Sequence, residues 1–182
     1  MPPRSVVLAE DETDLLLFPP LRACWTLRGE SAKVAISGWN ARRVIFGALN
    51  LRTGHRLLMA RNHQRGVDFQ DFLRLIHRHY RGWHVAMLLD SDSSHTATAS
   101  MVLAEHCQIE FFSLPKRSPH LNPMDHLWRD AKMHICANRQ YESIEDEVEQ
   151  FMAYIRDLSP REALHKAGVL SKGFWLKRVL SK

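Results

Sequence analysis

The chain has 182 residues, a formal net charge of +5, 45% hydrophobic residues and 25% charged residues. These values fit one soluble globular domain and exclude a disordered or fibrous chain. No window approaches ~18 consecutive apolar residues, and the N-terminus lacks the apolar core of a signal peptide, so no membrane partner is expected. Three cysteines without a CxxC pair predict reduced thiols in a cytoplasmic protein.

The positive charge is concentrated in residues 22–81, which hold twelve basic and three acidic residues. Eleven of the twelve are arginines, whose planar side chain suits bidentate contact with phosphate. Such a stretch favours a polyanionic partner, although a merely solvated surface explains the charge equally well.

The first half of the chain predicts an antiparallel meander. Apolar runs bounded by turn residues predict strands over residues 5–11, 33–37, 43–51 and 55–60. Residues 13–29, which contain two adjacent prolines, are expected to be irregular. Thr53-Gly54 predicts the hairpin turn between the last two strands.

The second half alternates helices with strands. Apolar spacing and capping residues predict helices over residues 68–79, 96–106, 123–137, 143–158 and 160–166, and strands over 83–89 and 109–114. Asn122-Pro123 opens one of these helices, because Asn is a favoured N-cap and Pro is favoured at the first helical position. The order implies an α/β fold with a mixed sheet covered by helices on both faces.

Three aspartates stand where acids can converge at one edge of such a sheet. Asp11 follows a short apolar run, Asp90 closes a stronger one, and Asp125 lies 34 residues further on in a Ser-Pro-His-Leu-Asn-Pro-Met-Asp-His-Leu-Trp string. Three converging acids cannot all stay ionised in a partly desolvated site without a cation. The pattern therefore indicates a magnesium site that acts on phosphodiesters.

Each aspartate by itself also has a structural explanation. Asp125 falls in the first turn of a helix, where an acid interacts with the helix dipole for ~0.3–1 kcal/mol. Asp90 could simply end a strand. Asp11 competes with neighbouring acids, although alternation along a strand puts Glu10 and Glu12 on the opposite face. Only the conjunction of the three favours catalysis.

Three segments resemble the catalytic blocks of DDE transposases, in the mariner-like superfamily and its bacterial insertion-sequence branch. They are residues 8–13, 88–95 and 114–128, and the last block is the most specific. Asp125 stands where many bacterial members have Glu, and Asp92 is an additional acid. The resemblance implies a ribonuclease H-like fold with a mixed five-stranded sheet.

The resemblance also implies a metal-dependent DNA endonuclease with two Mg²⁺ or Mn²⁺ ions about 3.5–4 Å apart. Asp11 would bridge both ions, while Asp90 and Asp125 would each bind one. The same site would nick DNA at the element ends and then join the freed 3′-hydroxyl to target DNA. A homodimer is expected in the active complex, associated with the nucleoid in the cytoplasm.

The catalytic domain is expected over residues 1–160, followed by a helical tail over 161–182. The helix-turn-helix domains that precede the catalytic domain in this family are expected to be absent. This suggests an alternative function, a catalytically silent or domesticated fragment that binds DNA or a full-length partner. A general nuclease or resolvase of the same fold would share the acids but not the Pro-His-Leu-Asn-Pro string.

Several side chains are candidate DNA contacts, namely Lys116, Arg117, Arg42, Arg43 and His95. His95 could equally begin a helix or pack in the interior. Trp39 could stack on a base, although buried packing is the more common environment of a tryptophan. The histidines and cysteines do not have the spacing of a structural zinc site.

Overall fold

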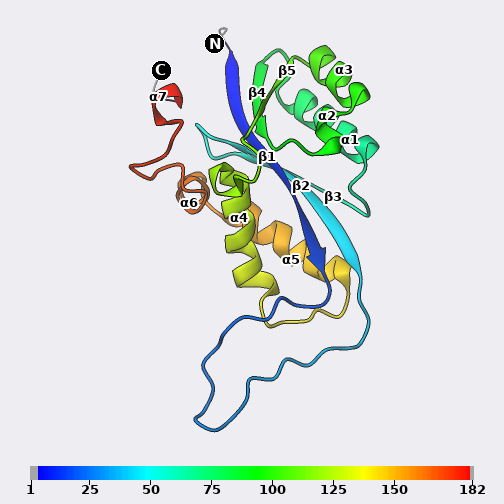
Figure 1. The fold of residues 1–182 in the computed structure, drawn as a ribbon, viewed down its shortest axis with the longest axis vertical. Helices are drawn as coiled ribbons and strands as arrows, with labels where there is room; N and C mark the ends of the chain where they lie inside the picture. The colour runs from blue at the N-terminus through cyan, green and yellow to red at the C-terminus, as the bar shows by residue number, and fades with distance from the viewer. Residues whose placement is uncertain (1–3, 181–182) are drawn as a thin grey trace.

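A five-stranded mixed sheet forms the centre of the protein (Figure 1). The computed structural model describes residues 4–180. The strands are β1 (Ser5–Leu16), β2 (Arg42–Asn50), β3 (Arg56–Arg61), β4 (His84–Leu89) and β5 (Ile109–Ser113). They lie in the order β3-β2-β1-β4-β5. The central strand β1 pairs antiparallel with β2 and parallel with β4, so the prediction of a mixed sheet is confirmed.

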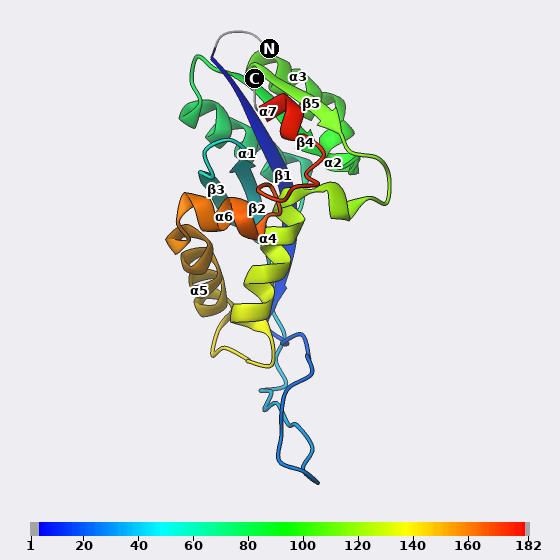
Figure 2. The same cartoon turned by 90° about the vertical axis from the view of Figure 1, so that its left-hand side faces the viewer.

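Helices cover both faces of this sheet, as predicted (Figures 1 and 2). They are α1 (Gly66–His79), α2 (Ser93–Thr96), α3 (Thr98–His106), α4 (Pro123–Ala131), α5 (Ile144–Asp157), α6 (Pro160–Lys166) and α7 (Lys177–Leu180), with the 3-10 helix η1 (Pro119–Leu121) and the π-helical turn η2 (Lys132–Cys136). One face packs on α1 and α3, and the other packs on α4, α5 and α6. Within residues 4–180, no helix has the length and apolarity needed to cross a bilayer.

The strand β1 contributes to both faces because successive side chains of a strand point in opposite directions. Val7 and Ala9 belong to the core cluster that α4 and α5 cover. Asp11 is the next residue after Val7 and Ala9 on this face of β1, the face that α4 covers. Glu10 and Glu12 lie on the other face, which confirms the alternation predicted for the three consecutive acids.

The close approach of α4 to the sheet depends on Gly47 in β2, which is the cross-strand partner of Asp11. A Cβ atom at this position would lie 2.5 Å from the Trp128 ring and 2.6 Å from the Met124 methyl group. Trp128 is almost fully buried and its ring stacks on Phe151, so the rigid ring has little room to move. The absence of a side chain at Gly47 therefore sets the distance between α4 and the strand that carries Asp11.

The segment between β1 and β2 is a long arm that extends beyond the sheet in both views (Figures 1 and 2). Residues 18–41 contain no strand, so the predicted strand over residues 33–37 is wrong. The segment has no neighbouring strand to pair with, and the backbone N–H of Ser37 donates instead to the Gln140 side chain. Trp39 is 80% exposed, so the expectation that it is buried is also wrong.

Other elements differ from the prediction mainly at their ends. β1 continues to Leu16 instead of ending at residue 11, because β2 pairs with it over this whole length. The helix predicted over residues 96–106 begins earlier and is divided at Ala97, whose backbone is extended. The hairpin turn at Thr53-Gly54 is confirmed.

The C-terminal segment contributes to the domain core. Ala163 and Leu164 of α6 are buried in the same cluster as Trp128 and Phe151. The domain boundary expected at residue 160 stays a prediction, but α6 packs as part of the layer that holds α4 against the sheet.

Replacing Gly47 with alanine should lower the free energy of unfolding by about 1–3 kcal/mol, because the new methyl group overpacks the interface with Trp128. Guanidinium unfolding followed by circular dichroism measures this loss. Gly66→Ala is a suitable control, since a Cβ atom there meets nothing within 4 Å. Equal stability of the Gly47→Ala variant and the wild type would show that α4 can move away from the sheet freely.

Candidate active site

Asp11, Asp90 and Asp125 line one pocket of about 540 Å³. Asp11 lies on β1, Asp90 directly follows β4, and Asp125 is in the first turn of α4. β1 and β4 run parallel with Ala9 opposite Leu88, so two residues further on the two aspartates reach the same level of the sheet. The structure therefore brings the three predicted acids together beside the central strand β1, at the level where β4 ends.

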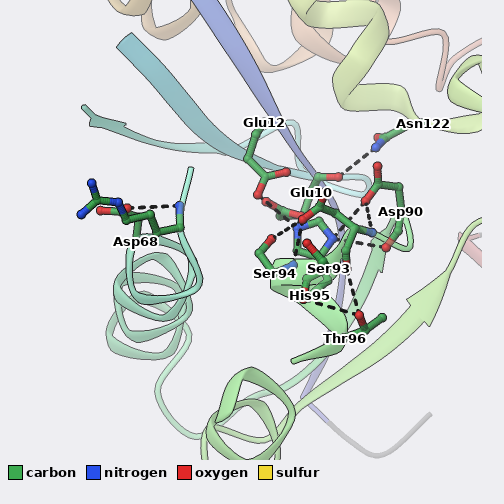
Figure 3. Close-up of polar contacts among 11 residues, drawn as sticks. Glu10, Glu12, Asp68, Asp90, Ser93, Ser94, His95, Thr96 and Asn122 are labelled. Carbon is green, nitrogen blue, oxygen red and sulfur yellow. Dashed lines mark hydrogen bonds and ion pairs between the residues drawn. The ribbon is translucent and has the colours of Figure 1, made fainter. Parts of the chain in front are cut away.

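Asn122 holds the start of α4 against β1. Its side-chain oxygen accepts a hydrogen bond from the backbone N–H of Met124 at 3.0 Å, which caps the helix. Its side-chain nitrogen donates to the backbone carbonyl of Glu10 at 2.8 Å (Figure 3). Because Asn122 is buried and uses both ends of its amide, it fixes the position of Asp125 relative to Asp11.

Asp11 lies in surroundings that disfavour its ionisation. Burial is the main cause that raises its pKa to about 8, and the charges of Glu12, Asp125 and Asp90 raise it further. A carboxylate in such surroundings is stabilised by a cation of high charge density. The donor set of the pocket consists of carboxylate oxygens, which are the ligands that Mg²⁺ and Mn²⁺ prefer.

Asp90 lies in different surroundings. A hydrogen bond from His95 is the main cause that lowers its pKa, and the backbone N–H of Asp92 adds a second hydrogen bond to the same oxygen at 2.9 Å. The pKa values of Asp11 and Asp90 are therefore shifted in opposite directions. Asp125 is held by Arg129, whose guanidinium donates to Oδ2 at 2.7 Å.

His95 contacts Glu10 and Glu12, the two acids on the face of β1 opposite Asp11, and Figure 3 shows these side chains together with Asp90. Glu12 also lines the pocket of the three aspartates. His95 is 1% exposed. Its Nε2 lies 3.1 Å from Glu12 and 3.8 Å from Glu10, and its Nδ1 lies 3.0 Å from Asp90. Because the ring is enclosed by these acids, His95 cannot reach a DNA phosphate in this structure, and the expectation that it contacts DNA is corrected.

The charges of this cluster depend on one another. Burial opposes a charge on His95, but hydrogen bonds to Asp90 and Glu12 and the nearby charge of Glu10 raise the pKa of His95 to about 11. Burial and the charge of Glu12 raise the pKa of Glu10 well above its usual value. Sequence reasoning placed the two glutamates on this face but missed their link to His95, because nothing in the spacing shows which residue α2 turns inward.

The cluster around His95 and the three aspartates of the pocket differ in the spacing of their potential ligand atoms. Among the residues that the structure describes, Glu10, Glu12 and His95 are a trio whose potential ligand atoms all lie within 4.8 Å of one another. The three aspartates of the pocket are not such a trio. The outer carboxylates of a two-ion site bind different ions, so a wider spacing is compatible with that kind of site.

The predicted basic contacts fall into two groups. Lys116 and Arg117 are exposed and line the same pocket as the aspartates. Arg42 pairs with Asp14 at 2.8 Å, and Arg43 pairs with Glu145. Arg42 and Arg43 therefore already have carboxylate partners, and their contact with DNA stays a prediction.

The whole arrangement agrees with one protein family. A family model described as DDE superfamily endonuclease matches residues 6–146, and the chain belongs to this family. Its fold is ribonuclease H-like, as the sequence predicted. The chain is similar to the insertion element IS630 uncharacterized 39 kDa protein of Shigella sonnei, with 26% identity over 156 residues that make up 85% of this chain and 46% of that protein.

Solved structures of Mos1 transposase share the fold. The mariner Mos1 paired end complex with Mg matches with a TM-score of 0.72 and 18% identity, covering 97% of this chain and 55% of that chain. The catalytic domain of Mos1 mariner transposase matches with a TM-score of 0.62 and 17% identity, covering 90% and 75% respectively. The chain thus spans about half the length of the IS630 protein and of the Mos1 chain in the paired end complex.

The raised pKa of Asp11 predicts how pH and Mg²⁺ affect stability. The stabilising contribution of its protonated form is complete below the unfolded pKa of 3.8 and is lost as pH rises through about 8. Without metal, wild-type protein should therefore lose stability relative to Asp11→Asn over this range. Mg²⁺ should raise the melting temperature of the wild type more at about pH 8.5 than at about pH 6, because it competes with the proton for Asp11.

Differential scanning fluorimetry with and without Mg²⁺ measures both effects. Asp157→Asn is the matched control, since Asp157 is an exposed acid at the end of α5. A response of Asp11→Asn to Mg²⁺ as large as that of the wild type would show that Asp11 does not bind the ion.

Proposed function

We propose that this chain is the catalytic domain of a DDE-type DNA transposase, which cleaves DNA strands and transfers their ends. The observation that carries the proposal is the convergence of Asp11, Asp90 and Asp125, from three separate elements, on one pocket. Membership of the DDE superfamily endonuclease family supports a phosphodiester as substrate.

The cofactor of this proposal is a pair of Mg²⁺ or Mn²⁺ ions held by the three aspartates. Asp11 would contact both ions, since its buried carboxyl is unfavourable to ionise without a cation and lies near both other acids. Bound metal would supply Lewis-acid stabilisation of the attacking and leaving oxygens. The mariner Mos1 paired end complexes with Mg and with Mn support the choice of metal.

The proposed reactions need no protein nucleophile. In the first, water attacks a phosphodiester and the 3′-oxygen leaves; in the second, the freed 3′-hydroxyl attacks a phosphodiester of the target strand, a new P–O bond forms, and the 3′-oxygen of the target strand leaves with a proton. Lys116 and Arg117 would hold the phosphates of the strand at the edge of the pocket. Arg117 has a left-handed backbone with φ of 58°, a conformation often found where a loop is shaped for function.

A homodimer is the proposed active assembly. The arm over residues 18–41 presents six large apolar side chains to solvent, namely Phe18, Leu21, Trp25, Leu27, Ile36 and Trp39. Trp25 is fully exposed, which is an unfavourable position for a tryptophan in an isolated domain. A second copy of the chain, joined by DNA, would give these side chains a partner. The Mos1 transposase paired-end complex with left transposon end is consistent with such an assembly.

Substitution of the proposed metal ligands tests the enzyme directly. Wild-type protein should nick supercoiled DNA in Mg²⁺ or Mn²⁺, and Asp90→Asn or Asp125→Asn should reduce the rate by at least about 100-fold, because each removes a carboxylate from the ions. Gel assays of plasmid nicking measure the rates, with Asp157→Asn as the control for charge. Absence of metal-dependent cleavage by well-folded wild-type protein would instead favour a silent DNA-binding fragment.

A second experiment addresses the substrate. DNA binding should weaken steeply with salt, because contacts to phosphate release counterions. The double variant Lys116→Gln with Arg117→Asn should reduce the slope of log K against log salt by about two, since Asn tolerates the left-handed backbone of Arg117. Fluorescence anisotropy measures the slope, and Arg156→Gln with Arg161→Gln removes the same charge from exposed positions on α5 and α6. Equal slopes for both double variants would place the DNA elsewhere.

A further inference from the structure

The imidazole of His95 connects the end of β4 to the middle of the neighbouring strand β1, beneath the proposed metal site. On one side, Nδ1 lies 3.0 Å from the Asp90 carboxylate and 3.2 Å from the Asp90 backbone carbonyl, at the end of β4. On the other side, Nε2 lies 3.1 Å from the Glu12 carboxylate on β1. Figure 3 shows the ring between these acids, reached from α2.

The ring has little freedom to leave this place. His95 is 1% exposed, and its ring centroid lies 4.5 Å from that of Phe69 in α1. The four-residue helix that carries it is capped by Asp92, whose Oδ1 accepts hydrogen bonds from both the N–H and the hydroxyl of Ser94 at 2.8 Å. The position of His95 is therefore set before any substrate or metal arrives.

These contacts leave the two oxygens of Asp90 in different situations. Oδ1 receives both His95 Nδ1 and the backbone N–H of Asp92 at 2.9 Å. Within residues 4–180, no group donates a hydrogen bond to Oδ2 of Asp90. The side chain of Asp90 is 60% exposed and lines the pocket, so the second oxygen is available there. Oδ1 of Asp90 is thus fixed by two contacts, and Oδ2 remains available to bind a cation in the pocket.

We propose that His95 is a positioning residue that orients the Asp90 carboxylate, through its Nδ1–H, for binding of a divalent cation. The inference rests on the proposed function, since it assigns a supporting partner to one of its three acids. A carboxylate ligand that is itself hydrogen-bonded loses less freedom on binding a metal, and removal of such a partner commonly weakens metal binding by about 10–100-fold.

Two substitutions separate the two sides of the ring. In His95→Asn the amide nitrogen takes roughly the place of Nδ1 and keeps a donor for Asp90. In His95→Gln the amide nitrogen takes roughly the place of Nε2 and keeps the contact with Glu12 but not with Asp90. Both variants lose the packing of the ring on Phe69, so each controls for the structural damage of the other.

Isothermal titration calorimetry of each purified protein with Mn²⁺, without DNA, measures metal affinity independently of catalysis. His95→Gln should bind Mn²⁺ at least about tenfold more weakly than the wild type, and His95→Asn should recover most of the affinity. Plasmid nicking should show the same order, with the Mn²⁺ concentration for half-maximal rate shifted to higher values in His95→Gln. Thermal unfolding should show similar losses for both variants.

Three results would overturn the inference. Equal Mn²⁺ affinity in the wild type and His95→Gln would show that Asp90 needs no support. Equal loss in both variants would show that the ring acts through packing alone. A stoichiometric transition metal that co-purifies with the wild type and is lost in His95→Gln would make His95 a ligand, together with Glu10 and Glu12, of a separate buried site.

Failure of the proposed function has a different signature. Wild-type protein that binds no Mn²⁺ and cuts no DNA would remove both the metal site and the role of His95. Wild-type binding and cleavage that His95→Gln leaves unchanged would remove only the role of His95.

Discussion

The carboxylate pocket depends on how closely α4 approaches the central strand of the sheet. Asn122 caps α4 and, with the same amide, donates to the backbone of β1. Gly47 leaves the space that the ring of Trp128 occupies one turn further along the helix. A helix N-cap ordinarily contributes about 1 kcal/mol of stability. Here the cap also determines that Asp125 meets Asp11, which turns an ordinary acid of a first helical turn into part of a site.

Glu10, Asp11 and Glu12 are three consecutive acids in the middle of a sheet, which is electrostatically unfavourable. Their charges are balanced differently on the two faces of β1. On one face, His95 lies among the acids and offsets the charge of Glu10 and Glu12. On the pocket face, burial and neighbouring acids leave Asp11 with a pKa of about 8. The proposed ions would take the place of the proton on Asp11 and stabilise its ionised form. Local loss of stability is common where a site is built for function.

The number of basic residues in 22–81 overestimates how much positive charge is available to bind nucleic acid, because several of these residues have partners within the domain. Arg56 reaches the last carbonyls of α5, Arg61 and Arg74 pair with acids of α1, and Arg42 and Arg43 pair with acids of β1 and α5. Four of the eleven arginines counted from the sequence thus connect different elements of the domain, and Arg74 pairs with Asp71 within α1. Exposed cations next to the pocket, Lys116 and Arg117, lie outside that stretch and were found from their position before the third acid.

The amino-acid sequence by itself determined the order of strands and helices, the alternation along β1 and the three aspartates, because periodicity and capping act within a few residues and are visible in the chain. It failed at the arm, where residues 33–37 have the composition of a strand but no neighbour to pair with. Only the tertiary structure decided that His95 turns inward to the acids, that Gly47 leaves room for α4, and that five of the eleven arginines in residues 22–81 have partners within the domain. Those outcomes depend on contacts between residues far apart in the chain, which local propensity does not encode.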